Sequence, residues 1–254
     1  MTKVDDRHPS SDYLEAIYEM AEEGIPTIQA RVAEWMGMSR ASVSEHVTRL
    51  IRDGLLVADG RALGFTPEGE PIARSLVRRH RLAEHFLIRL IGLPWHQAHE
   101  EAGRWERVIS AQVEERLVDI LKDPATCPHG NPIPGSSHSV DYSRLVPLQE
   151  IPAGGRAVLR RLTEDLELEL DVMRFLESSG LMPGASISVN DVGPDGTMNL
   201  EVAGASVALG AHLSDNLWVD PKPGLRQRSG SPSDRAQAAT RYPHGTRSAV
   251  NDLT

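Results

Sequence analysis

Apolar residues recur at helical spacing in three segments near the N-terminus of the chain. Because side chains three or four residues apart share one face of a helix, this spacing predicts helices over residues 11–22, 28–36 and 40–53. Gly37 is expected to end the second helix in a left-handed conformation, which glycine adopts without strain. Ser39 has the character of an N-cap for the third helix. A short helix, a glycine turn and a second amphipathic helix form the helix-turn-helix arrangement.

The next segment has the pattern of a β-hairpin. Short apolar runs at residues 55–58 and 62–66 flank residues 59–61 (Asp-Gly-Arg), and Asp-Gly is a strong turn dipeptide. This hairpin is expected to be the wing of a winged helix-turn-helix domain that places residues 40–53 in the major groove of DNA. A plain three-helix bundle with a solvated face is the competing interpretation. The ordered combination of helices, cap and hairpin disfavours it.

Polar side chains on the outer face of residues 40–53 are the first candidates for DNA contact. Arg49 and Arg52 are expected to bind phosphates, and Glu45 can accept a hydrogen bond from the N4 amino group of cytosine. Ordinary solvated side chains would give the same pattern at each of these positions. The full set of candidate DNA-binding residues also includes positions before the helix and in the hairpin turn: Thr27, Ser39, Arg40, Ala41, Ser42, Glu45, Arg49, Arg52 and Arg61.

The rest of the chain divides by pattern into two further units and a tail. Residues 67–90 and 94–122 have the spacing of long helices. Residues 123–139 are rich in Pro, Gly, Ser and His and are expected to be a loop and linker. Short apolar runs alternate with turns over residues 147–219, which predicts a small β-barrel or sandwich. Residues 221–254 have almost no apolar pattern and are expected to be disordered.

Composition narrows the class of protein. The 254 residues are 40% hydrophobic and 25% charged, as in ordinary soluble globular proteins. No apolar run approaches the roughly 20 residues of a membrane helix, and residues 1–10 lack the apolar stretch of a signal peptide. Cys127 is the single cysteine, which excludes an intrachain disulfide and fits the reducing cytoplasm. A net charge of −9 argues against a general nucleic-acid coat protein, but not against a specific regulator with a local basic face.

Histidines and carboxylates at helical spacing are candidate metal ligands. His80 and Glu84 lie four residues apart and hence on one helix face, and Glu106 lies seven residues after His99 on the next predicted helix. Asp12 and Glu15 offer two further carboxylates near the N-terminus. A mixed set of imidazole and carboxylate suits a divalent first-row ion such as Mn(II) or Fe(II). The same spacing also occurs in ordinary polar helix faces, and an Asp at the start of a helix is also a common cap.

Three segments together resemble the diphtheria toxin repressor family of iron- and manganese-dependent transcriptional regulators. These segments are residues 77–84 (VRRHRLAE), 99–106 (HEEAGRWE) and 130–135 (GNPIPG). The resemblance covers residues 11–135 closely and extends more loosely over residues 147–219, which look like the family's SH3-like third domain. It implies a winged helix-turn-helix, a helical dimerisation domain and two metal sites between them.

The resemblance implies a set of metal ligands. His80, Glu84 and His99 match the family's ancillary site, to which the third domain adds ligands, and Glu169 and Asp171 are the nearest acidic candidates there. Asp12 and Glu106 match the primary site, and Asp12 with Glu15 looks like the manganese-responsive branch. The complete set of candidate metal ligands is His80, Glu84, His99, Glu169, Asp171, Asp12, Glu15 and Glu106.

The chain departs from the family at the primary site. Gly103 stands where the family has a Cys or Glu ligand, and Arg107 stands where it has a His ligand. A fixed cation would repel a divalent ion. We therefore expect little or no ion there, with Arg107 paired to Glu106 or Asp12 in place of the metal. His129, beside Cys127, is interpreted as a residue of a surface loop.

These observations define a fold class and a domain plan. The chain is expected to be α+β and mainly α, with a winged helix-turn-helix over residues 1–66 and a helical dimerisation and metal-binding domain with linker over 67–139. An SH3-like (FeoA-like) β-barrel over 140–220 and a disordered tail over 221–254 complete it. One apolar side of the segment 94–122 is expected to form core and dimer interface, through Trp105, Val108, Ile109, Val113 and Leu117.

Three classes of function are candidates for this chain. The first is a cytoplasmic, metal-dependent repressor of metal-uptake or metal-homeostasis genes, which binds a pseudo-palindromic operator in double-stranded DNA as a homodimer without a membrane partner. The second is a winged-helix regulator of the same fold that acts independently of metal. The third is a metal-dependent enzyme, which is disfavoured because the chain has no nucleophile motif, no phosphate-binding loop and no HExxH segment.

Overall fold

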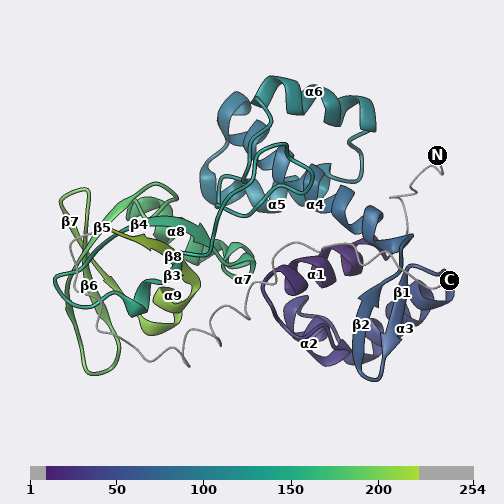
Figure 1. Cartoon of the computed structure of the whole chain (residues 1–254), viewed down its shortest axis with the longest axis horizontal. Coiled ribbons are helices and arrows are strands. Elements are labelled where there is room, and N and C mark those ends of the chain that lie inside the picture. Colours follow the sequence, from purple (N-terminus) through teal and green to yellow (C-terminus); the bar gives the residue numbers. More distant parts are fainter. Residues whose placement is uncertain (1–9, 223–254) are drawn as a thin grey trace, which may run out of the picture.

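The computed structural model describes residues 10–222 and arranges them in three lobes (Figure 1). Helices α1, α2 and α3 and a two-stranded hairpin form the first lobe, a group of helices around α4 forms the second, and a sheet with short helices forms the third. The elements of the first lobe are α1 (Ser11–Glu22), α2 (Gln29–Trp35), α3 (Arg40–Arg52), β1 (Leu56–Asp59) and β2 (Ala62–Phe65).

The first lobe confirms the predicted winged helix-turn-helix. The backbone of Gly37 is left-handed, with φ of 61°, and the Ser39 hydroxyl accepts a hydrogen bond from the backbone N–H of Ser42 at 3.2 Å. Strands β1 and β2 pair in antiparallel register, with Asp59 opposite Ala62 across the turn. On α1, Met20 is fully buried and the neighbouring Ala21 is exposed, so the buried face is set by the larger side chain.

The second lobe differs from the predicted pair of long helices. Helix α4 (Gly69–Phe86) continues into a π-helix, η1 (Leu87–Ile91), but the segment 94–122 is broken rather than continuous. It contains a 3-10 turn, η2 (Trp95–Gln97), then α5 (Ala98–Trp105) and α6 (Ala111–Leu121). The Ser110 hydroxyl accepts from the N–H of Val113 at 3.3 Å and so starts α6 as a new helix.

This break changes which apolar residues of the second lobe lie in its core. Ile109 and Leu117 are buried, as expected, and pack with α4. Val108 is 79% exposed and Val113 is 47% exposed in the single chain. These two side chains are therefore available for contact with a second subunit and do not belong to the core.

The third lobe is built on a six-stranded antiparallel sheet with the order β3-β8-β4-β5-β6-β7. Alternate side chains of its strands are buried, as expected for a sheet with one covered face. The elements are β3 (Val146–Pro147), η3 (Leu148–Glu150), β4 (Arg156–Leu162), α7 (Glu164–Glu167), α8 (Leu170–Ser178), β5 (Ser186–Val192), β6 (Met198–Val202), β7 (Ala205–Leu209), α9 (Ala211–Asn216) and β8 (Leu217–Pro221).

The segment before the third lobe is not a free linker, contrary to expectation. Cys127, His129 and Asn131 are buried within it, and the backbone N–H of Leu162 on β4 donates to the carbonyl of His129 at 3.0 Å. Trp95 of the second lobe is buried in the core of the third lobe. These contacts hold the third lobe against the other two.

Two expectations concern the chain as a whole, namely the disordered tail and the absence of a membrane helix, and the structure covers only part of the residues involved. The predicted disordered tail falls almost entirely on residues 223–254, which lie outside the described residues. Within residues 10–222, none of the helices combines the length and the apolar composition that crossing a bilayer requires.

Candidate metal centre and nucleic-acid interface

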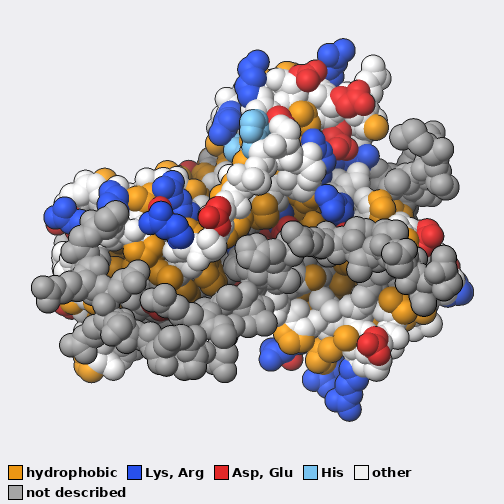
Figure 2. All heavy atoms as spheres, in the orientation of Figure 1, with side chains coloured by type: hydrophobic (Ala, Val, Ile, Leu, Met, Phe, Trp, Pro, Cys, Tyr) orange, Lys and Arg blue, Asp and Glu red, His pale blue; other side chains and the backbone are white. Residues whose placement is uncertain are grey.

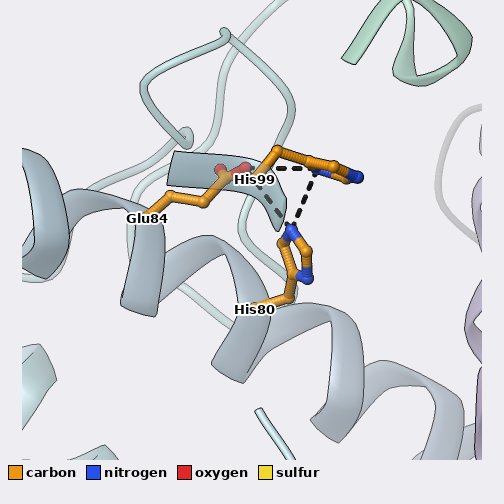
Figure 3. A group of neighbouring side chains, drawn as sticks. All are labelled: His80, Glu84 and His99. Carbon is orange, nitrogen blue, oxygen red and sulfur yellow. Dashed lines mark hydrogen bonds and ion pairs between the residues drawn. The ribbon is translucent and has the colours of Figure 1, made fainter. Parts of the chain in front are cut away.

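Three predicted ligands meet between the second and third lobes. His80 and Glu84 project from α4 and His99 from α5, and the three side chains point toward one another (Figure 3). The Nε2 atom of His80 lies 3.1 Å from Nδ1 of His99 and 3.4 Å from Oε1 of Glu84, while His99 Nδ1 lies 3.5 Å from the same oxygen. The predicted convergence of His80, Glu84 and His99 is therefore confirmed.

Two further residues complete what we call the inner cluster: His80, Glu84, His99, His129 and Glu167. Nδ1 of His129 lies 3.2 Å from Oε1 of Glu84 and 2.8 Å from Oε2 of Glu167. The same Glu167 oxygen is 3.3 Å from Nδ1 of His99. The interpretation of His129 as a surface-loop residue is wrong, because its side chain is 0% exposed. Cys127 lies beside the cluster, where its Sγ atom accepts from the His129 N–H at 3.3 Å.

Glu169 and Asp171 do not reach the inner cluster, which corrects the expectation for the third lobe. Glu169 is half-exposed and lies 3.7 Å from Nε2 of His212, and the Asp171 side chain is 95% exposed and pairs with an arginine one turn later. The single-turn helix α7 turns Glu167 and Glu164 toward the other lobes instead. Two carboxylates on one short helix directly after β4 are the sequence signal that could have identified them.

The inner cluster is a fit for a cation because its buried polar atoms face one another without being satisfied. Among the described residues, both carboxylate oxygens of Glu84 and both ring nitrogens of His129 lack a hydrogen bond of good geometry, although His129 Nδ1 contacts Glu84 and Glu167 at ion-pair distance. Such buried orphan atoms are rare unless an ion or water serves them. Burial favours a raised pKa for Glu84, but the facing His129 outweighs burial and holds this pKa well below its usual range. A charged carboxylate among imidazoles suits a divalent first-row ion.

A second group, the outer cluster, consists of Asp12, Glu15, Glu106 and Arg107. Glu15 and Glu106 lie close enough to His80 to share an ion with it, but the group also contains the fixed cation of Arg107. Arg107 donates to Oδ1 of Asp12, and its Nε atom lies 3.7 Å from Oε1 of Glu106. The predicted pairing of Arg107 with these carboxylates is therefore confirmed. A Cβ atom at Gly103 would lie 4.0 Å from Cε1 of His80, so a side chain there would point at the site, but glycine offers none.

His80 connects the two clusters through its two ring nitrogens. Its Nδ1 atom lies 2.8 Å from Oε2 of Glu106 and 3.4 Å from Oε1 of Glu15, while Nε2 faces the inner cluster. Burial, followed by the neighbouring carboxylate of Glu106, raises the pKa of Glu15 well above its usual range. The raised pKa of Glu15 and the Arg107 cation both act to reduce the negative charge that the outer cluster could offer to an ion.

The predicted DNA-binding residues lie in the first lobe, mostly on or beside α3. Ser42 approaches the Tyr13 hydroxyl at 3.4 Å, while Arg40 and Ala41 are exposed in the first turn of α3. The Thr27 hydroxyl donates to the carbonyl of Leu63 at 2.7 Å, so it holds the hairpin to the body of the lobe. Basic side chains, which are all arginines in this lobe, stand out at its lower edge in the space-filling view (Figure 2).

Two arginines of this surface are paired with neighbouring carboxylates in the free protein. Arg49 lies 3.1 Å from Glu45, and Arg52 lies 2.9 Å from Asp53. Arg61 is exposed at the turn of the hairpin. Exposed ion pairs of this kind contribute at most about 1 kcal/mol, so phosphates can replace the carboxylates at little cost.

Family models match almost the whole described chain. Residues 9–62 match the iron dependent repressor N-terminal DNA binding domain, and residues 66–135 match the iron dependent repressor metal binding and dimerisation domain. Residues 146–221 match the FeoA domain. The three matched ranges correspond to the three lobes.

Curated proteins and solved structures are similar over most of their length. The chain is 42% identical to the iron-dependent repressor IdeR of Mycobacterium tuberculosis over 202 residues, which are 76% of this chain and 87% of that protein. It is 37% identical to the diphtheria toxin repressor of Corynebacterium diphtheriae over 218 residues, 82% of this chain and 95% of that protein. A manganese-dependent transcriptional repressor in complex with manganese is 28% identical, with a TM-score of 0.72, covering 84% of this chain and 100% of that one.

The geometry predicts one Mn(II) ion per subunit, held in the inner cluster. Replacing His129 by Ala should lower Mn(II) affinity at least about tenfold, since even residues behind the ligands change affinity by 10–100-fold. Glu169→Ala is the matched control and should leave affinity unchanged, because Glu169 lies outside the cluster. Titration calorimetry measures both affinity and stoichiometry. Two ions in the unmodified chain would contradict the exclusion of metal by Arg107.

The same geometry predicts that ion affinity rises with pH up to about 9. Burial lowers the pKa of His99, but its hydrogen bonds to Glu167 and Glu84 outweigh burial and raise this pKa to about 9 in the ion-free protein. A ligating imidazole must give up the proton on its donor nitrogen, so protons compete with the ion below this pH. Titrations in buffers of different ionisation enthalpy should show proton release. An affinity that is flat between about pH 7 and 9 would show that His99 is not a ligand.

Proposed function

Because this chain belongs to the iron-dependent repressor family, we propose that it is a metal-dependent transcriptional repressor with Mn(II) or Fe(II) as cofactor. Members of the family are DNA-binding regulators, and they act as dimers. The observation that carries the proposal for this chain is the inner cluster, in which imidazoles and carboxylates from three segments face one another with unsatisfied atoms. Repression of metal-uptake or metal-homeostasis genes in the cytoplasm follows as the biological role.

The residues that would hold the ion are His80, Glu84, His99, His129 and Glu167. A bound divalent ion supplies positive charge to buried carboxylates that otherwise rely on protonated imidazoles. Glu106 takes a different role from the expected one. It accepts a hydrogen bond from Nδ1 of His80, so the ring is oriented with Nε2 toward the cluster. A carboxylate behind a ligating histidine fixes its tautomer and raises its basicity.

Ion binding at this place acts on the arrangement of the lobes. His80 and Glu84 belong to α4, His99 to α5, His129 to the buried loop and Glu167 to the third lobe. Helix α4 also packs along α1 of the DNA-binding lobe through a common apolar core. An ion that draws these segments together therefore favours one position of α3 relative to a second subunit, and the spacing between two recognition helices determines operator affinity.

In the dimer that we propose, the two subunits contact each other through the second lobe. This lobe matches the family model for the metal binding and dimerisation domain. Large apolar side chains of this lobe remain exposed in the single chain, which is unfavourable unless a partner covers them. They are Leu90, Ile91, Val108, Val113 and Ile120. Two copies related by a two-fold axis would read the two halves of a pseudo-palindromic operator.

A second candidate function is a regulator of the same fold that acts without metal. Arg107 favours this metal-independent function, because its side chain already joins Asp12 of α1 to Glu106, the residue that directly follows α5. The inner cluster favours the metal-dependent repressor, since Glu84 contacts imidazoles at 3.2 to 3.5 Å but forms no hydrogen bond of good geometry within the described residues. We further propose that the functional domains span residues 1–66, 67–139 and 140–220, and that the second and third domains bind the ion.

The repressor function predicts DNA binding that depends on a divalent ion. DNA selected by the protein from a random pool in the presence of Mn(II) should be retarded on gels with Mn(II) or Fe(II) and released by chelator. Glu84→Gln, which keeps the shape of the side chain but removes its charge, should abolish the response to ion. Equal binding with ion and with chelator would refute metal control and favour the second candidate.

The DNA interface predicts a change in salt dependence at two positions. Arg49→Ala and Arg52→Ala should each weaken binding to every sequence and lower the slope of log affinity against log salt by about one. Arg174→Ala is the control, because Arg174 is an exposed arginine of the third lobe that pairs with Asp171. Fluorescence anisotropy across a salt series measures the slopes. Unchanged slopes in both α3 variants would show that α3 does not face DNA as proposed.

A further inference from the structure

A buried arginine of the third lobe holds the end of a helix in the DNA-binding lobe. Arg161 lies on β4 and is 0% exposed. Its Nη2 atom donates to Oε1 of Glu23, the residue that directly follows α1, and the Glu23 side chain is only 5% exposed. The backbone N–H of Glu164 donates to the same oxygen at 3.2 Å. The third lobe therefore binds α1 directly, in addition to its contacts with the second lobe.

The Nε atom of the same arginine is connected to the inner cluster by hydrogen bonds. The Nε atom of Arg161 donates to Oδ1 of Asn131, and Nδ2 of Asn131 donates to Oε1 of Glu167 at 2.6 Å. The second oxygen of Glu167 faces His129 at 2.8 Å and His99 at 3.3 Å. Three consecutive buried hydrogen bonds thus connect a candidate ion ligand to the C-terminal end of α1.

The direction of each bond in this chain is determined by chemistry. A guanidinium only donates and a carboxylate only accepts, so Asn131 must present its oxygen to Arg161 and its NH2 group to Glu167. The loop that carries Asn131 is held tightly, since a Cβ atom at Gly130 would lie 2.1 Å from the carbonyl oxygen of Arg160. Asn131 therefore cannot move away from β4 without breaking this packing.

We propose that Asn131, Arg161 and Glu23 form a relay that couples ion binding at Glu167 to the position of α1, and hence to DNA affinity. The inference rests on the proposed function, and it makes the third lobe part of the switch. An ion that draws Oε2 of Glu167 into the inner cluster orients Oε1 toward Asn131. This orientation places Arg161 over Glu23 and holds α1 in the DNA-binding arrangement. Asn131, Arg161 and Glu23 are positioning residues, because none of them contacts ion or DNA.

The test measures the response to ion as the ratio of DNA affinities with Mn(II) and with chelator. The main variant is Glu23→Gln combined with Arg161→Met, since removing both charges leaves no unpaired buried ion to unfold the protein. It should bind one Mn(II) per subunit with unchanged affinity, while the ratio falls by about tenfold, within the usual range of coupling between sites. Asn131→Leu should reduce the ratio to the same extent.

The control variant is Arg160→Met, on the same strand. Arg160 is half-exposed and lies 3.6 Å from Asp220, so its removal should leave the ratio unchanged. Combining Asn131→Leu with the double variant should cause no further loss, because residues of one relay are not additive. An unchanged ratio in the double variant overturns the relay. Loss of Mn(II) binding in that variant also overturns it, since the residues would then serve only to build the ion site. Absence of any Mn(II) response in the unmodified chain is a failure of the proposed function itself.

Discussion

The structure depends on the burial of negatively charged carboxylates among imidazoles where the three lobes meet. Removing a charge from water is costly unless an opposite charge and hydrogen bonds replace the water. Glu84 is fully buried and faces His129, His80 and His99, which belong to different segments of the chain. A movement of α5 or of the buried loop would remove an imidazole from this carboxylate. A divalent cation can therefore reinforce contacts between lobes that also share apolar packing, α4 with α1 and Trp95 with the third lobe.

Fixed cations of the chain hold several other carboxylates between the lobes. Arg81 on α4 donates to Glu22 at 2.6 Å and to Glu164 at 2.5 Å, which ties α1 to α7. Arg161 and Arg107 hold Glu23 and Asp12 in the same manner. Helix α1 is thus held at both ends by arginines from the other lobes. An ion in the inner cluster would need to supply only the charge that these arginines do not.

Local signals made the DNA-binding lobe predictable, and long-range packing made the ion site harder to predict. The bounds of α1 were predicted to the residue, because apolar spacing and the composition of its ends agree with its tertiary contacts. His80, Glu84 and His99 followed from helical spacing and family resemblance. His129 did not, since a segment rich in Pro and Gly normally lies at the surface, whereas here β4 covers it. Glu167 was missed for Glu169, because α7 ends at Glu167 and turns it inward, whereas Glu169 lies between α7 and α8 and is half-exposed.

The position of His80 means that the two clusters cannot be considered separately. Nδ1 of His80 is hydrogen-bonded to Glu106, and Nε2 faces Glu84 and His99. An ion on Nε2 requires the proton of the ring to lie on Nδ1, where Glu106 accepts it. Arg107 lies 3.7 Å from the other oxygen of Glu106. This arginine of the outer cluster is therefore linked to the inner cluster through Glu106 and His80, so a change at either cluster bears on the other.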